Sequence, residues 1–468
     1  MSHPQLLTLR VTQALLHQAR AAQFQFGADT ALVAVQHMLL QTVDLFDTAG
    51  AMGLNLKNIF ALGKVYSNSP PVIEMLRGRG VTVIESTTPA PGEFHSSFER
   101  DVQTLWRVTA ETLAQRNVKR ILVLDDDGVC INNVPREVLH RYEICGVEQT
   151  SQGVFLFEVQ PPPFPVISWA RSAVKLQIGG PIFSQCFIER LNTEFLYGRS
   201  IQGKQLGIIG MGSIGRALAK LALRQGIKVL FYDPAPDVYS PSSLHGIIER
   251  THSLEELMLT SDYVAGCSGR NPFEGRWPLK HRPGIRLFSI STGDQEFGPI
   301  INDLKTRSDF AVDPITCTIT SEHGTSGPIQ IAYLGYPYTF VSRAPEAVPT
   351  QIVQLETGGL LASLIQAHLY LETCETSAEH NKDLRRVSPE AQRFVYETWL
   401  RTMKDCGISL IETFDYDAEL LSTAHQVDWL SQHTEPHEDE LDEIDRIVEK
   451  RMAEFVRRDY TVKARGGA

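Results

Sequence analysis

A glycine-rich turn constrains the fold of this chain more than any other feature. Gly210, Gly212 and Gly215 follow a short apolar run and open a helix-like stretch. In a Gly-x-Gly-x-x-Gly turn the first glycine allows a tight bend, the second lets backbone approach a pyrophosphate, and the third lets helix and strand pack closely. The pattern therefore predicts a Rossmann-type dinucleotide-binding domain centred on residues 203–234. The alternative is a glycine turn in an α/β sheet that binds nothing.

The residues after this turn indicate which dinucleotide is bound. The helix expected over Arg216–Arg224 offers unpaired N–H groups and a positive dipole end to the phosphates. Ser213 and Ile214, just before it, are expected to contact the cofactor. Asp233 ends the next apolar run, where a carboxylate accepts hydrogen bonds from ribose hydroxyls and repels a 2′-phosphate. The sequence thus predicts NAD rather than NADP. Further cofactor contacts are expected from Thr150, Ser268, Gly269 and Ser289.

Apolar strand-like runs alternate with helical stretches along most of the chain, which is typical of parallel α/β sheets. We expect an α/β protein with a doubly wound Rossmann-type NAD domain, a second, discontinuous α/β substrate-type domain and a helical C-terminal tail. The proline-rich segment 161–172 is interpreted as a crossover between domains. The expected boundaries are 1–185 for the first part of the substrate-type domain, 186–345 for the NAD domain, 346–375 for a return helix and 376–468 for the tail.

Charge and cysteine usage narrow the possible partners. The formal net charge of −11 disfavours nucleic acid and anionic lipid. The seven cysteines show no CxxC or Cys/His ligand spacing, so free thiols are expected and no metal site is predicted. The start of the chain lacks a signal-peptide pattern, and no run of apolar residues is long enough to span a membrane. We expect a soluble cytoplasmic protein that acts on a small molecule.

Two families resemble this sequence. The segment GKQLGIIGMGSIGRALAKLALRQGIKVLFYDP is similar to the cofactor loop of D-2-hydroxyacid dehydrogenases, although that match is local. A wider resemblance, over roughly residues 30–370, is to S-adenosylhomocysteine hydrolase. It is carried by QHMLLQT, VLDDDG, GVEQTSQGV, PFPVISWARSAVK, SISTGDQEF and YLGYPYTFV, in that order. The second resemblance implies a split substrate domain, a central NAD domain and homo-oligomers, either dimers or tetramers.

The hydrolase resemblance also implies three catalytic or substrate-binding residues. These are His37, Asp126 (with a register uncertain by one relative to Asp125) and Lys175. Other interpretations remain open. His37 lies in an apolar stretch expected to be helical and could be a core or interface group, the aspartates could cap a helix, and Lys175 could be a surface lysine or a base with a desolvated amine.

The same resemblance shows departures that bear on activity. Gln149 stands where the family has a catalytic glutamate, Gly179-Gly180 replace an Asp-Asn pair, and Thr292 and Tyr336 replace two histidines. We therefore expect little or no adenosylhomocysteine hydrolysis. The leading hypothesis is an NAD-dependent enzyme with an altered site that performs redox at a secondary hydroxyl of a small polar or nucleoside-like substrate. The alternatives are a non-catalytic NAD-binding regulatory or scaffold protein and an atypical 2-hydroxyacid dehydrogenase.

The C-terminal tail carries apolar positions at helical spacing that a lone appendage could not bury. We expect these residues to mediate self-association while the acidic run 435–445 stays solvated. The apolar residues concerned are Phe394, Val395, Trp399, Leu400, Ile408, Leu410 and Ile411.

Overall fold

The computed structural model describes most of the chain. It covers residues 9–195, 201–235, 248–291, 293–314, 316–324, 326–342, 344–374, 384–408 and 442–457. Thr292, Leu410, Ile411 and the acidic run up to residue 441 lie outside the described residues. Among the described helices, none combines the length and apolar character needed to cross a membrane.

The first sheet has seven parallel strands in the order β15-β6-β5-β4-β1-β2-β3. Its central strands read as almost continuous apolar runs, as expected for parallel strands covered on both faces. The order reverses direction between β1 and β4, which defines a topological switch point. The strands are β1 (Thr30–Met38), β2 (Ile59–Asn68), β3 (Thr82–Ile84), β4 (Arg120–Asp125), β5 (Glu143–Glu148), β6 (Val166–Ser168) and β15 (Leu384–Arg386).

Two hydrophobic cores cover the faces of this sheet, because successive side chains of each strand point to opposite sides. Leu32 and Ala34 of β1 belong to one core, and Val33 and Val35 belong to the other. Eleven described α-helices accompany the sheet: α1 (Arg10–Ala22), α2 (Leu40–Ala51), α3 (Pro70–Gly78), α4 (Phe94–Leu113), α5 (Val129–Asn132), α6 (Arg136–Arg141), α7 (Ser151–Val159), α8 (Gly180–Arg190), α12 (Thr350–Cys374), α13 (Pro389–Asp405) and α16 (Glu443–Arg457).

The second sheet has eight strands in the order β12-β13-β14-β11-β10-β7-β8-β9. The part from β14 to β9 is parallel, and β12 and β13 add antiparallel pairs at one edge. Its switch point lies between β7 and β10. The elements are β7 (Gln205–Ile209), α9 (Ser213–Arg224), β8 (Lys228–Tyr232), β9 (Glu249–Arg250), α10 (Leu254–Thr260), β10 (Tyr263–Gly266), β11 (Ile285–Ser289), α11 (Gly298–Leu304), β12 (Ala311–Val312), β13 (Ile319–Gly324) and β14 (Gly327–Ile331).

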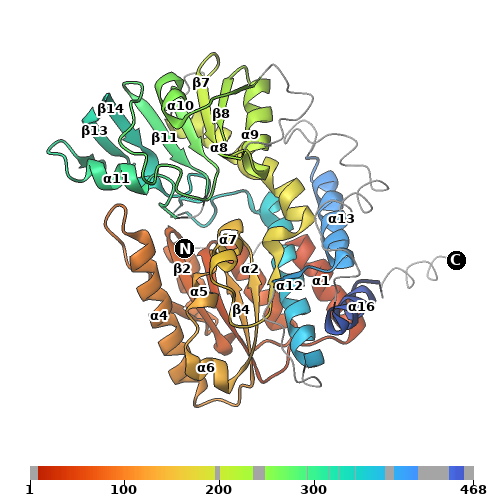
Figure 1. Ribbon diagram of the computed structural model, residues 1–468. Helices are drawn as coiled ribbons and strands as arrows, with labels where there is room; N and C mark the ends of the chain where they lie inside the picture. Colours follow the sequence, from red (N-terminus) through yellow and green to blue (C-terminus); the bar gives the residue numbers. More distant parts are fainter. Residues whose placement is uncertain are drawn as a thin grey trace.

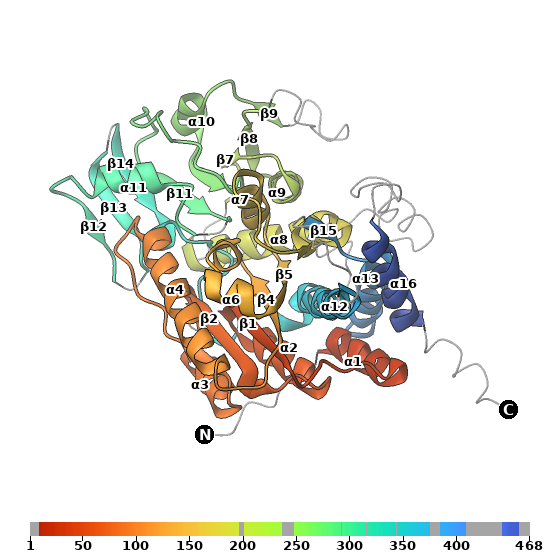
Figure 2. The same ribbon diagram turned by 60° about the horizontal axis from the view of Figure 1, so that its bottom comes forward.

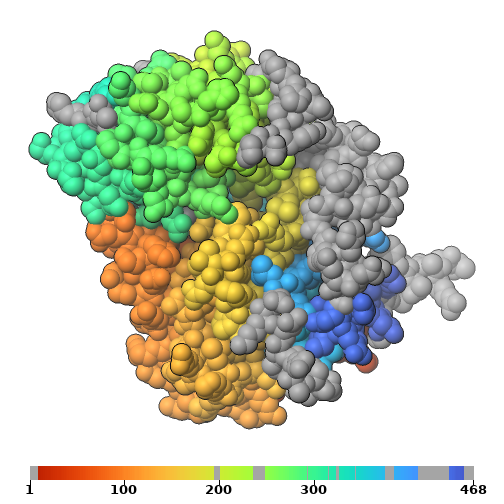
Figure 3. Space-filling view, viewed as in Figure 1, coloured from red at the N-terminus to blue at the C-terminus, as the bar shows by residue number. Residues whose placement is uncertain are grey.

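The two sheets form two lobes. We call the part around β1–β6 and β15 the first lobe and the part around β7–β14 the second lobe. Figure 1 shows the second lobe, in green, above the first, in orange, and Figure 2 shows α8 between them beside α9. In the space-filling view the green surface lies against the orange and yellow surface of the first lobe (Figure 3). The expected α/β fold with a Rossmann-type domain and a second α/β domain is confirmed.

Two local expectations were wrong. The stretch 30–38 is a buried strand rather than a helix. It pairs in parallel with β2 and β4 and is covered on both faces, so its sequence lacks the apolar–polar alternation that would have distinguished it from a helix. The proline-rich segment 161–172 is not a crossover between lobes. It contains β6, which pairs with β5 inside the first sheet, followed by a 3-10 turn at Trp169–Arg171.

The C-terminal region is not wholly helical, because β15 adds a parallel strand beside β6. Its apolar side chains also find partners within the same chain. Phe394, Val395 and Trp399 of α13 are buried in the core that α1 and α12 share, while Leu400 and Ile408 pack at its margin. The inference that these residues need a second subunit to cover them was therefore wrong.

Candidate functional site

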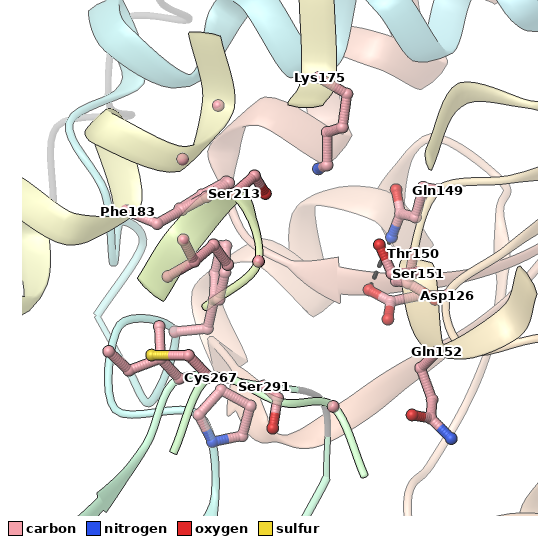
Figure 4. A pocket seen from close by; sticks show the side chains of 18 of the residues that line it. Asp126, Gln149, Thr150, Ser151, Gln152, Lys175, Phe183, Ser213, Cys267 and Ser291 are labelled. Atoms are coloured by element: carbon pink, nitrogen blue, oxygen red, sulfur yellow. Dashed lines mark hydrogen bonds between the residues drawn. The ribbon is translucent and has the colours of Figure 1, made fainter. Parts of the chain in front are cut away.

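A cavity of about 500 Å³ lies where the two lobes meet. It is bounded by the carboxyl ends of the central strands of both sheets, the edge where α/β proteins bind ligands. Residues that follow β1, β4 and β5 line it from the first lobe, and residues that follow β7, β8, β10 and β11 line it from the second. Figure 4 shows Lys175 pointing into the cavity from one side and Asp126 and Gln149 from another, with Cys267 and Ser291 from the second lobe below.

The predicted glycine turn forms one wall of this cavity. Gly210 follows β7 with φ +92°, and a Cβ there would lie 2.7 Å from Ser268 Cα. Gly212 precedes α9, and a Cβ there would meet nothing within 4 Å, so this backbone is open to a ligand. Gly215 does not line the cavity. A Cβ there would lie 2.0 Å from Gly210 O, so the lack of a side chain at this position permits α9 to pack against β7.

The start of α9 is arranged to receive an anion. Its N-cap, Gly212, has no side chain to cap the first N–H groups, and Ser213 and Ile214 line the cavity. Asp233 follows β8 on the same wall. Its carboxylate accepts hydrogen bonds from the N–H groups of Met211, at 2.8 Å, and Ala235, at 2.9 Å. These bonds fix the carboxylate beside the glycine turn.

The loop after β10 completes the second-lobe wall with Cys267, Ser268 and Gly269. Buried Glu296 holds this loop, because it accepts hydrogen bonds from Ser268 N (2.8 Å) and Ser268 Oγ (2.9 Å). Burial raises the pKa of Glu296. Ser289, expected to contact the cofactor, does not line the cavity. It is fully buried, and its hydroxyl donates to Glu296 at 2.8 Å, so it supports the cavity wall from behind.

The first-lobe wall brings His37 and Asp126 together at the switch point of the first sheet. His37 Nε2 lies 3.3 Å from Asp126 Oδ2, and His37 Nδ1 lies 2.5 Å from Ser67 Oγ. Burial lowers the pKa of His37 to about 4, although the carboxylate of Asp126 acts to raise it. The ring is therefore neutral near pH 7. In the neutral ring Nδ1 accepts from the Ser67 hydroxyl, and Nε2 carries the proton and faces the Asp126 carboxylate.

The three aspartates at the carboxyl end of β4 have different roles. Asp125 accepts hydrogen bonds from the N–H groups of Asp126 and Ile131, at 2.8 Å each, and thus shapes the loop and the start of α5. Asp127 accepts a hydrogen bond from buried Lys64. Only Asp126 among them lines the cavity. Asp125 therefore fits the helix-cap interpretation, while ligand binding by Asp126 stays a prediction.

Asp126 is held by two further groups. Gln149 Nε2 donates to its Oδ2 at 2.6 Å, and Lys64 Nζ lies 3.7 Å from its Oδ1. The Lys64 side chain is fully buried. Burial acts to lower its pKa, but the carboxylates of Asp127 and Asp126 outweigh this and raise it. Lys64 therefore stays an ammonium group that balances part of the acidic charge.

Lys175 is not a surface residue. It lines the cavity, and its Nζ donates to Glu356 Oε2 of α12 at 2.8 Å. Trp169 Nε1 donates to the same oxygen at 2.7 Å. Gly179 leaves room for this carboxylate, since a Cβ there would lie 2.9 Å from Glu356 Oε1.

The comparisons with known proteins bear on the second lobe. Residues 186–272 match the family model described as D-isomer specific 2-hydroxyacid dehydrogenase, NAD binding domain. The cofactor is NAD. This match agrees with the cradle around Gly210, Gly212 and Asp233, and it supports the predicted resemblance of this segment to D-2-hydroxyacid dehydrogenases.

Curated relatives extend the similarity. The chain is 28% identical over 272 residues to the uncharacterized protein Rv0104 of Mycobacterium tuberculosis, covering 58% of this chain and 51% of that protein. It thus spans about half the length of that relative. A hydroxypyruvate reductase of Thermotoga maritima is 52% identical over only 40 residues, 8% of this chain and 13% of that protein. The resemblance to S-adenosylhomocysteine hydrolase gains no support from these matches.

Solved structures that match include a D-lactate dehydrogenase from Salmonella, with 19% identity, a TM-score of 0.28 and coverage of 58% of this chain and 75% of that chain. Another is a putative D-3-phosphoglycerate dehydrogenase from Ralstonia solanacearum, with 16% identity, a TM-score of 0.36 and coverage of 76% and 98%. Because their TM-scores and sequence identities are this low, these structures carry no argument about the activity of this chain.

Sequence reasoning missed three charged residues near the NAD site. Lys64 sits in the apolar run IFALGKVYS, Glu356 in the apolar helix IVQLETGGLL, and Glu296 after an apolar strand. A charged residue inside an apolar segment is a signal of a paired buried group, since unpaired burial is costly. Lys64 pairs with a residue 63 positions away and Glu356 with one 181 positions away, so this signal could have found these two residues but not their roles.

Proposed function

We propose that this protein is an NAD-dependent oxidoreductase that interconverts a secondary hydroxyl group and a carbonyl group of a small polar substrate. The observation that carries the proposal is that one cavity joins the NAD cradle of the second lobe to Lys175 and Asp126 of the first. A substrate held by these two side chains would share one cavity with the cofactor. The cofactor half is of the D-2-hydroxyacid dehydrogenase type, and the substrate half is atypical for that group.

The residues fit the following roles. When bound, NAD supplies the acceptor for hydride. Lys175 exchanges a proton with the substrate oxygen, and Glu356, 2.8 Å from its amine, is the next group in that exchange. Asp126 binds a hydrogen-bond donor of the substrate. His37 and Gln149 hold Asp126 in place and are positioning residues, because both ring nitrogens of His37 are already engaged.

Hydride transfer tests this proposal directly. The protein is incubated with NAD and secondary alcohols, or with NADH and the matching carbonyl compounds, and absorbance of the reduced nicotinamide is followed. Lys175→Met is expected to lower the turnover number by about 10²–10⁴-fold, the usual contribution of a proton-transfer group. Its NAD affinity, measured by calorimetry, should stay unchanged.

Lys204→Met is the matched control, because Lys204 is an exposed lysine of the second lobe outside the cavity. It should retain full turnover. Binding of NAD without hydride transfer to or from any compound of the panel would contradict the proposal and favour a non-catalytic NAD-binding protein.

A further inference from the structure

The charges that line the cavity are already balanced. The Lys175 ammonium pairs with Glu356, and both are largely shielded from solvent. Arg270 is the other Lys or Arg side chain among the described lining residues, but it is 64% exposed at the rim, where it lies 3.7 Å from Glu158. Asp126 adds a negative charge on another side of the cavity. The described interior therefore offers no unbalanced cation to an anionic substrate.

Three polar atoms of residues that line the cavity are themselves buried and have no hydrogen-bond partner within the described chain. They are Gln36 Nε2, Gln41 Oε1 and Glu356 Oε1. An amide can be turned so that either end faces the ligand, but a carboxylate oxygen can only accept. Buried polar groups are normally satisfied. Glu356 Oε1 lies against the bare backbone of Gly179 and is closed to a ligand, but the charge of Glu356 beside Lys175 would repel an ionised carboxyl group brought there.

We infer that the substrate is an uncharged molecule rich in hydrogen-bond donors rather than a 2-hydroxy carboxylate, and that Glu356 is the residue that sets this specificity. The inference rests on the proposed function for its substrate, but the selection against carboxylates is a property of the pocket alone. Glu356 neutralises Lys175, the cation that a substrate carboxylate would need, and the Asp126 carboxylate on the cavity wall accepts from donors of the substrate.

The position of Glu356 is fixed from three sides. Trp169 donates to Oε2, Lys175 donates to the same oxygen, and the bare backbone of Gly179 faces Oε1. A carboxylate ligand could capture Lys175 only by leaving Glu356 buried without a counter-charge, which is strongly unfavourable. The Lys175–Glu356 pair therefore excludes small anions from this end of the cavity.

The test compares two probes that differ in charge and little else, D-lactate and D-lactamide. Binding is measured by calorimetry in the presence of NADH, so that neither probe can be oxidised. Wild type is expected to bind lactamide in preference to lactate. In Glu356→Gln, Lys175 loses its counter-charge, and the ratio of lactate affinity to lactamide affinity should rise by about tenfold or more, the effect of removing a close like charge.

Two further variants make the result decisive. Glu356→Ala removes the carboxylate without adding an amide and should show the same gain, which covers the case in which the glutamine variant folds poorly. Lys175→Met combined with Glu356→Gln should lose the gain. NAD affinity is measured in every variant to confirm an intact fold.

A preference of the wild type for lactate would overturn the inference, as would an unchanged ratio, or no lactate binding, in both Glu356 variants. Because the readout is binding, a protein that transfers no hydride would still give the expected pattern. Failure of the proposed function and failure of this inference are therefore distinguishable.

Discussion

Asp233 is the residue whose position follows most directly from the local sequence. Its two carboxylate oxygens accept from Met211 N and Ala235 N, so the side chain has one orientation beside the glycine turn. A 2′-phosphate brought to this place would meet a fixed negative charge in a partly desolvated wall. The preference for NAD over NADP should therefore depend on this one carboxylate.

Replacing Asp233 with Ser and Ala235 with Arg should narrow or reverse that preference. The change removes the repelling charge and adds a cation on the cavity wall, so we expect the ratio of NAD affinity to NADP affinity to fall by about tenfold or more. Calorimetric titration with both cofactors measures the ratio. Ala235→Arg alone is the control and should change it less. Equal affinities for NAD and NADP in the wild type would contradict the role given to Asp233.

The contrast between Asp233 and Glu356 shows what sequence could predict at this scale. The glycine turn and Asp233 lie within one strand–helix–strand unit, so their spacing alone predicts their contacts. Glu356 meets Lys175 across 181 positions of the chain, and no local pattern records such a pairing. Asp126 and Lys175 were predicted from a resemblance that the comparisons do not support, yet the fold brings both to one cavity.

At the scale of elements, α16 is the part whose role differs most from expectation. Val448, Met452, Phe455 and Val456 are buried against the core that includes α1 and α12. Arg386 of β15 pairs with Glu449 at 2.6 Å and Arg451 pairs with Glu372. The apolar face of α16 therefore packs against the core of its own chain and needs no second subunit to cover it.

Met452→Ala should test this. Truncating a fully buried methionine costs about 2–5 kcal/mol through lost transfer energy and the remaining cavity. Urea denaturation should show that loss in the free energy of unfolding. Ile447→Ala, on the exposed side of the same helix, is the control and should stay within about 0.5 kcal/mol of wild type.

Light scattering on the same proteins addresses self-association. We expect Met452→Ala to keep the oligomeric state of wild type while it is folded. A change of oligomeric state with no change in unfolding free energy would contradict the intramolecular role of α16.

The elements around the glycine turn of the second sheet were predictable because their strand and helix patterns are local, whereas β1 of the first sheet was mistaken for a helix because a strand buried on both faces does not alternate. The C-terminal elements were also not predictable. β15 is only three residues long and is defined by pairing with β6, more than 200 positions earlier. The apolar faces of α13 and α16 were visible in the sequence, but what covers them depends on the tertiary fold.

For the whole molecule, a neutral buried histidine links stability to pH. The pKa of His37 is about 4 in the folded protein, against about 6.5 in an unfolded chain. The unfolded state thus binds more protons between these values. His37 therefore adds no pH dependence to the free energy of unfolding above about pH 6.5, and it lowers that free energy as the pH falls toward 4.

His37→Gln removes this titration. The stability advantage of wild type over the variant should shrink by about 2 kcal/mol between pH 7 and pH 5, measured by urea denaturation at both values. Other buried groups such as Asp125, whose pKa burial raises to about 7, titrate in both proteins and largely cancel. His140→Gln, at an exposed position, should show no such change. A pH-independent difference for His37→Gln would mean that the pKa of His37 is the same in the folded and unfolded states.

The way the chain passes through the two lobes has a consequence for the ribosome-bound nascent protein. The second sheet is made by one continuous stretch, β7 to β14, whereas the first sheet receives β15, and its core receives α12, α13 and α16, from the far end of the chain. Domains fold as units when their residues are all available. The second lobe can therefore fold during synthesis, whereas the first lobe, although its first strands are synthesised earlier, lacks its last strand and three covering helices until the end of the chain has been made.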